Sequence, residues 1–143
     1  MLTAVHSAEA RLKAAHHSLV IEVPPSELYG LVQRSNQRAL WLTGIQPGAT
    51  EEILVNEPPK HLALSQHTRS SAWRLDVFLA PDPLGTRVEF RGQLTRTPFF
   101  ARLLGSFFQT MFSKKLHASL LALQSLAHEA VATGGNEGLE PKQ

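Results

Sequence analysis

A long run of apolar residues at helical spacing near the C-terminus constrains the fold of this chain more than any other feature. From Thr97 to Val131, apolar side chains recur every three or four residues, which predicts one amphipathic helix. At about 1.5 Å per residue this helix would be roughly 50 Å long, more than the width of a compact domain of this size. The helix must therefore lie along another element, and the strand-rich middle of the chain is the candidate.

The residues before that helix predict an antiparallel sheet. A β-branched run between His16 and Val23 predicts the first strand, and two short helices are expected between Pro25 and Gly44. Apolar and polar residues then alternate, or form short apolar runs, in segments separated by turn residues: Ile53–Val55, Leu62–Ser65, Trp73–Leu79 and Val88–Leu94. Because the connections are short, the strands form a meander with one apolar face, which the long helix covers.

The composition indicates a single domain with one core, since 43% of the 143 residues are apolar. We expect residues 1–15 to form an N-terminal arm, 16–131 the folded domain and 132–143 a glycine-rich disordered tail. The absence of cysteine excludes disulfides and thiolate chemistry. No apolar run approaches the length of about 18 residues that spans a membrane, and the N-terminus lacks a signal-peptide core, so a cytoplasmic location is the default expectation.

The charge pattern argues against nucleic acid as a partner, and the histidine spacing argues against a metal site. The net charge is +2, and no basic run is interleaved with stacking aromatic residues. His16 and His17 are adjacent, so on a strand they point to opposite faces. His61 and His67 would lie about 20 Å apart along one strand, too far to share an ion. We therefore expect neither a metal nor a cofactor.

Four segments of the chain resemble turns and junctions of one protein family. They are Val23–Leu28 at a strand-to-helix junction, Leu40–Ile45 around a tryptophan, Asn56–Leu62 in a turn, and Leu84–Phe90 at the start of the last strand. Their order and spacing resemble the bacterial polyketide cyclase and coenzyme-Q-binding-like branch of the START-like SRPBCC superfamily, over residues 16–131. The resemblance implies an α+β helix-grip fold, in which a curved antiparallel sheet packs on a long C-terminal helix.

The resemblance also carries expectations about function. The superfamily binds hydrophobic or amphipathic small molecules, such as lipids, sterols, polyketides and quinones, between sheet and helix, and some members catalyse cyclisation or dehydration. The implied function is binding, and in some members transport, of such a ligand, and the fold alone does not decide whether catalysis occurs. Where members have two strands, this chain has only Ile45 to Thr50, so one strand is expected to be reduced or missing. The edge left there could pair with a second copy, which makes a homodimer one expectation.

The ligand site is expected where alternation turns side chains toward the interior. The expected ligand-binding residues are an apolar and aromatic set with one amide: Trp41, Trp73, Leu75, Phe90, Leu94, Leu104, Phe108, Phe112 and Gln66. Ordinary core packing is the alternative for each aromatic residue. If the protein is a cyclase or dehydratase, His67 or Tyr29 would move the proton. The alternative for His67 is that Leu62 and Leu64 set the inward parity and turn it outward.

The N-terminal half of the long helix is more apolar than one packing face requires. Between Phe99 and Phe112, apolar side chains cover over half of its circumference, and Lys114 and Lys115 end the stretch. Leaving three phenylalanines in water would forgo roughly 5–9 kcal/mol of burial. This surface is therefore expected to have a partner: a ligand, a second subunit of an interaction or dimerisation module, or a membrane surface that it contacts transiently.

Overall fold

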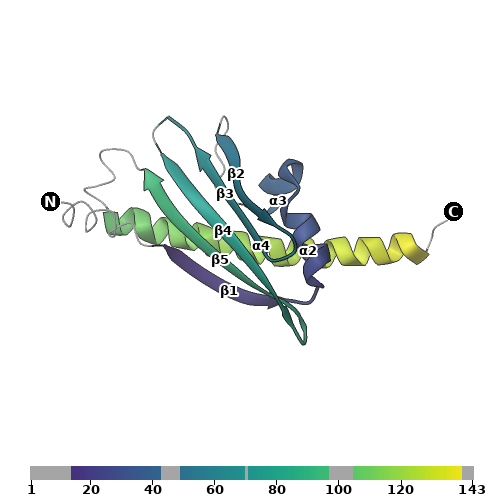
Figure 1. The fold of residues 1–143 in the computed structure, drawn as a ribbon. Helices are drawn as coiled ribbons and strands as arrows, with labels where there is room; N and C mark the ends of the chain where they lie inside the picture. The colour runs from purple at the N-terminus through teal and green to yellow at the C-terminus, as the bar shows by residue number, and fades with distance from the viewer. Residues whose placement is uncertain (1–13, 43–48, 70, 97–104, 140–143) are drawn as a thin grey trace.

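Five antiparallel strands form a sheet in the part of the chain that the computed structural model describes, residues 14–42, 49–69, 71–96 and 105–139. The strands are β1 (Ala15–Ile21), β2 (Thr50–Glu57), β3 (His61–His67), β4 (Ala72–Asp82) and β5 (Gly85–Arg96), in the spatial order β1-β5-β4-β3-β2. The helix α4 (Gly105–Leu139) lies along one face of this sheet (Figure 1). Helix α2 (Pro25–Val32), the 3-10 turn η1 (Ser35–Gln37) and helix α3 (Arg38–Trp41) follow β1.

The architecture confirms the α+β helix-grip fold that the sequence predicts, and one boundary differs. We expected residues 132–143 to be a disordered tail, whereas α4 continues to Leu139. Gly134 and Gly135 each cost a helix about 1 kcal/mol relative to alanine, which weakens a helix without necessarily ending it. Residues 1–13, 97–104 and 140–143, and with them most of the expected arm and the expected start of the helix, lie outside the described residues.

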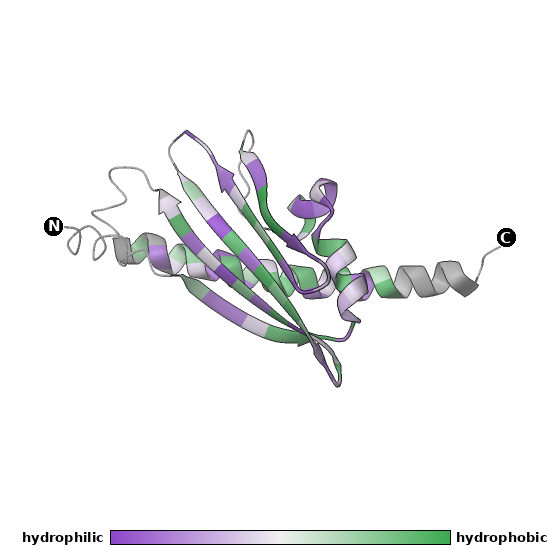
Figure 2. Cartoon of the chain, in the orientation of Figure 1, coloured by the Kyte–Doolittle hydropathy of each residue, from purple (hydrophilic) through white to green (hydrophobic). Residues whose placement is uncertain are grey.

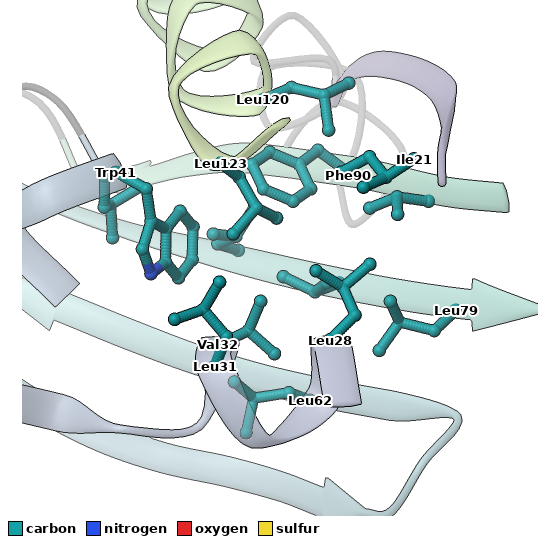
Figure 3. Close-up of a cluster of buried hydrophobic side chains, with 14 of the residues drawn as sticks. Ile21, Leu28, Leu31, Val32, Trp41, Leu62, Leu79, Phe90, Leu120 and Leu123 are labelled. Carbon is teal, nitrogen blue, oxygen red and sulfur yellow. The ribbon is translucent and has the colours of Figure 1, made fainter. Parts of the chain in front are cut away.

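Alternation along the strands determines which face of the sheet α4 covers. Along β4, Leu75 and Val77 are fully buried on the inner face, and Asp76 between them lies on the opposite, outer face. Figure 2 shows the resulting bands of hydrophobic and hydrophilic residues along the strands. The largest side chains of the core come from the strands and from all three helices (Figure 3), among them Ile21, Leu28, Val32, Trp41, Leu62, Phe90, Leu120 and Leu123.

A close contact between the start of β5 and the end of β1 fixes the point where the chain turns into α2. Gly85 has a φ of 145°, and a Cβ added there would lie 2.3 Å from the carbonyl oxygen of Ile21. Glycine is therefore required at this position. The hydroxyl of the next residue, the fully buried Thr86, donates a hydrogen bond of 2.6 Å to the carbonyl oxygen of Val23.

The strands β1 and β2 form the two edges of the sheet in the described part of the chain. The strand that we expected to be reduced or missing falls between Ile45 and Thr50, and residues 43–48 lie outside the described residues. Within the described residues, no helix combines the length and the apolar character needed to cross a bilayer.

We expect Gly85→Ala to lower the free energy of unfolding by about 2–4 kcal/mol, because the new methyl group would meet backbone atoms at an unfavourable φ. Gly30 in α2 is the matched control, since a Cβ added there has nothing within 4 Å. Gly30→Ala should raise the free energy of unfolding by about 0.5–1 kcal/mol. Urea denaturation measures both changes, and a Gly85→Ala variant as stable as the wild type would contradict this account.

Candidate ligand site between the sheet and helix α4

The inner face of the sheet is buried to different degrees at its two ends. Next to α2 its apolar side chains are fully buried, as Leu62 and Val77 are. At the other end, Trp73 of β4 and Leu94 of β5 lie opposite each other and are half-buried, as is Phe112 of α4. The rings of Trp73 and Phe112 meet edge to face with their centroids 5.9 Å apart. This half-covered end, beside the N-terminal half of α4, is the candidate ligand site.

Gly92 of β5 allows α4 to come close to the sheet at this site. A Cβ added to Gly92 would lie 3.0 Å from Cζ of Phe112 and 3.2 Å from Cδ1 of Leu116. A larger residue would push both side chains away from the sheet. The glycine therefore seats the Phe112 ring against β5, where the ring forms one wall of the candidate site.

Two histidines connect the edge strand β1 to α4 beside Phe112. The Nε2 atom of His17 lies 3.1 Å from the carbonyl oxygen of Ser113 and 3.0 Å from its Oγ. The His17 and His117 rings lie with their centroids 4.9 Å apart. Burial, and secondly the charge of His117, lower the pKa of His17 below its ordinary value of 6.5. Because the neutral form is favoured, this contact between strand and helix is sensitive to acid.

A buried polar cluster joins α3 to β2 and β3. Arg38 is only 2% exposed. Its Nε and Nη2 atoms donate to the two carboxylate oxygens of Glu51 at 3.0 Å each, and it also donates to the carbonyl oxygen of Val32. The amide nitrogen of Gln66 donates to Glu51 at 3.0 Å. Although burial acts in the opposite direction, the hydrogen bonds from Arg38 and Gln66 lower the pKa of Glu51.

Two buried polar atoms near this cluster have no hydrogen-bond partner among the described residues: Nε1 of Trp41 and Oε1 of Gln66. Leaving such a group unpaired costs about 1–3 kcal/mol. Gln66, which was predicted to bind the ligand, is buried on the inner face of β3. Its amide nitrogen already donates a hydrogen bond to Glu51. Its role toward a ligand stays a prediction.

The structure divides the predicted aromatic and apolar site residues into two groups. Trp41, Phe90 and Leu75 are fully buried, and the rings of Trp41 and Phe90 pack with their centroids 5.6 Å apart. All three residues therefore belong to the core, where Figure 3 shows Trp41 and Phe90. Trp73, Leu94 and Phe112 remain half-buried at the candidate site. Leu104 and the side chain of Phe108 lie outside the part of the chain that is described, so their roles stay predictions.

Of the two predicted acid or base residues, His67 faces away from the candidate site. His67 is exposed at the end of β3, whereas its neighbour Gln66 is buried on the inner face. Because successive side chains of a strand point to opposite faces, His67 lies on the outer face. Leu62 and Leu64 face the interior, so the alternation along β3 turns His67 outward. The prediction that His67 is turned toward the interior is wrong.

Tyr29, the other candidate, is buried in α2 near the fully buried end of the sheet. Its hydroxyl donates to Oδ1 of Asn56 and lies 3.3 Å from the carbonyl oxygen of His61. Burial raises the pKa of Tyr29 above its ordinary value, so the hydroxyl stays protonated at neutral pH. These hydrogen bonds tie α2 to β2 and to β3, and a catalytic role for Tyr29 stays a prediction.

Sequence reasoning did not identify the contacts among Arg38, Glu51 and Gln66 or those among His17, Ser113 and His117. Each set joins separate elements, so that finding it requires the strand register and the position of α4. Nothing in the sequence marks Arg38 and Glu51, which are 13 positions apart, as partners of each other. Across the described ranges, no three histidine, aspartate or glutamate side chains are grouped so as to hold a metal ion.

No protein family model matches the chain, and neither does any curated protein sequence. Solved structures do match. The protein BH1534 from Bacillus halodurans superposes with a TM-score of 0.66 at 14% identity, covering 81% of this chain and 97% of that chain. The di-domain ARO/CYC StfQ from the steffimycin biosynthetic pathway superposes with a TM-score of 0.65 at 12% identity, covering 89% of this chain and 55% of that chain.

A third match is the Aha1 dimer from Colwellia psychrerythraea, with a TM-score of 0.58 at 14% identity over 78% of this chain and 92% of that chain. The chain has the helix-grip fold. The superposition confirms the fold that the resemblance implied. At these identities, the likeness of this helix-grip domain to its structural neighbours concerns the fold.

We expect this helix-grip domain to lose stability in two steps as the pH falls. The pKa of His17 is lower in the folded state, so its contribution to stability is present above pH 6.5 and is lost as the pH falls below that value. Hydrogen bonds and charges lower the pKa values of Glu51 and Glu89 against the effect of burial, so their contributions are lost below about pH 4.5.

Urea denaturation across the acidic range separates the two steps. His17→Gln should remove the first step and retain the second. The adjacent residue provides the control, because His16 lies on the outer face and pairs with Glu89. His16→Gln should retain the first step and weaken the second. A first step that survives in His17→Gln would show that another group causes it.

Proposed function

We propose that this START-like domain binds a hydrophobic or amphipathic small molecule, such as a lipid, a quinone or a polyketide-like compound. The ligand would lie between the ends of β4 and β5 and the N-terminal half of α4. The observation that carries the proposal is the incomplete burial of Trp73, Leu94 and Phe112 on an inner face whose other end is fully buried. Covering apolar surface contributes about 25 cal/mol for each Å² removed from water.

The neighbouring surface of α4 supports a ligand of this kind. Phe107 is 56% exposed and Met111 is 36% exposed, so the apolar surface continues past Phe112. The Trp73 and Phe112 rings meet at an interplanar angle of 71°, and paired aromatic walls of this kind suit a flat or long apolar ligand. Binding would come from apolar burial, with few polar groups to orient the ligand.

One structural neighbour supports a small-molecule ligand, and the site geometry favours binding over catalysis. StfQ, described as an ARO/CYC of the steffimycin biosynthetic pathway, has the same fold. In this chain, however, His67 points away from the proposed site and the hydroxyl of Tyr29 already forms hydrogen bonds. Neither residue predicted to act as an acid or base therefore faces Trp73 and Leu94, so we favour a carrier that binds its ligand and releases it unchanged.

Two further expectations about partners stay predictions. A homodimer could form through β2, which lies at a sheet edge of the described part and exposes Ile53 and Leu54 by 43% and 39%. The Aha1 neighbour from Colwellia psychrerythraea was solved as a dimer. A single monomeric mass in light scattering across micromolar concentrations would exclude the homodimer. Transient membrane contact through residues 99–112 depends largely on residues outside the described part of the chain.

A charge placed on the inner face should weaken ligand binding strongly, whereas the same charge on the outer face should leave it unchanged. The neutral dye N-phenyl-1-naphthylamine, whose fluorescence rises in apolar surroundings, reports binding. We expect Leu94→Asp to weaken dye binding by about tenfold or more, because a carboxylate would face the apolar site. Thr95→Asp is the matched control, since Thr95 is the next residue of β5 and is exposed.

Thermal unfolding followed by circular dichroism checks that both variants fold. Equal dye binding by the Leu94→Asp and Thr95→Asp variants would place the dye elsewhere. A wild-type protein that takes up no dye would contradict the proposed function.

A further inference from the structure

The outer face of the sheet, opposite α4, carries a hollow that the proposed ligand site does not use. Its volume is about 500 Å³, which lies in the range of small-molecule pockets. It lies where β4 approaches its turn into β5, beside the turn between β2 and β3. The residues on which its properties depend are Lys60, His61, Phe78, Ala80, Pro81 and Arg87.

An aromatic pair forms one wall of this hollow. His61 and Phe78 lie directly opposite each other on β3 and β4, and their rings stack with centroids 4.2 Å apart and an interplanar angle of 18°. Asp76 holds the imidazole through a 2.8 Å contact with Nε2, and the guanidinium of Arg91 lies 5.3 Å from the centre of the Phe78 ring. The wall is therefore fixed in place before any ligand arrives.

The floor of the hollow results from a small side chain. Ala80 lies two residues after Phe78 on β4, so both side chains point to the outer face. Ala80 is exposed, and the intervening Leu79 is buried on the inner face. The large side chain of Phe78 fills the space above its part of the outer face, whereas the methyl group of Ala80 leaves the space above it open. Pro81 adds further apolar surface to the floor.

Two cations flank this floor. The carbonyl oxygen of Lys60 accepts a hydrogen bond from the amide of Leu79, and Arg87 pairs with Ala80 across β4 and β5. Because β3 and β5 are both neighbours of β4, the two backbones lie about 10 Å apart. Lys60 forms no ion pair with any residue of the described ranges, and the nearest carboxylate oxygen of Asp82 lies 3.9 Å from Arg87.

Glu89, Glu57 and Arg87 each have a charged or titratable neighbour, whereas Lys60 has no ion pair within the described ranges. Glu89 contacts Nε2 of His16 and accepts a hydrogen bond of 3.1 Å from Arg91. Glu57 lies 3.9 Å from Nδ1 of His61, the same distance that separates Arg87 from Asp82. Lys60 is therefore the cation most available to a ligand, and the exposed Arg87 adds a second positive charge on the other side of the apolar floor.

We propose that this hollow is a second binding site, which takes a small organic anion: a carboxylate or phosphate carried on a compact apolar or aromatic group. The anionic group lies between Lys60 and Arg87. The apolar body covers Ala80 and Pro81 and meets the wall formed by His61 and Phe78. This site is independent of the proposed function, since the two sites lie on opposite faces of the sheet.

Three probes separate the contributions of charge and apolar contact: 2-naphthoate, the neutral 2-naphthalenemethanol and inorganic phosphate. In a titration followed by amide NMR shifts, 2-naphthoate should perturb Lys60, Ala80 and Arg87. It should bind about fivefold or more tightly than the alcohol, and added salt should weaken its binding. Phosphate, which lacks the apolar body, should bind more weakly than 2-naphthoate.

Substitutions at exposed positions locate the site without disturbing the core. Lys60→Gln and Arg87→Gln should each weaken 2-naphthoate binding about three- to fivefold. Ala80→Leu should fill the floor and abolish the shifts. Arg69→Gln, an exposed arginine in the turn at the opposite end of β3 and β4, is the control and should change nothing.

The proposal would be overturned if 2-naphthoate did not bind, if the neutral alcohol bound equally well, or if Ala80→Leu left binding unchanged. Shifts confined to Trp73, Leu94 and Phe112 would also overturn it, because they would place the anion at the inner site and leave the function proposed there intact.

Discussion

The packing of α4 on the inner face of the sheet is the contact on which the rest of the structure depends. The strands alternate with a period of two, which places most of the large apolar side chains of β4 and β5 on one face and leaves that face in need of a cover. The stripe of α4 that supplies this cover consists of buried residues at helical spacing, Leu116, Leu120, Leu123 and Ala127. The two short helices complete the core beside this stripe, where Trp41 packs on Phe90.

The same contact changes character along α4. From Leu116 onward the helix seals the core, and at Phe112 it meets the sheet through half-buried aromatic side chains. Gly92 brings α4 close, and His17 holds it to the edge strand through Ser113. A small-molecule site requires fixed walls and apolar surface that a ligand can cover. The rigid core at one end of α4 fixes the walls, and the half-buried side chains at the other end leave apolar surface for the ligand.

The periodicity of the sequence predicted an antiparallel sheet covered by one long helix, and the family resemblance added the helix-grip fold. The spacing of three or four residues identified α4, and the alternation identified the sheet and its apolar face. Individual side chains were harder to place, since a shift of one residue moves a strand residue to the other face. Gln66 and His67 are neighbours on β3, so only one of them can face inward, and the observed register places Gln66 on the inner face and His67 on the outer face.

Contacts between distant residues could not be predicted from the sequence. His17 and Ser113 are 96 positions apart, and only the position of α4 over β1 brings them together. The Arg38 and Glu51 pair depends on how α3 lies against β2. The hollow on the outer face depends on Ala80 lying between strands that carry longer side chains, which is a property of register.

The central claim is that apolar surface left half-covered between the sheet and α4 is completed by a small molecule. Native mass spectrometry of the freshly purified protein, followed by solvent extraction and analysis of the released compounds, tests it most directly. The account predicts a bound species that adds a defined mass to the chain and is recovered in the apolar extract. A protein that carries no such species, and that gains none after exposure to fatty acids, quinones or polyaromatic compounds, would contradict it.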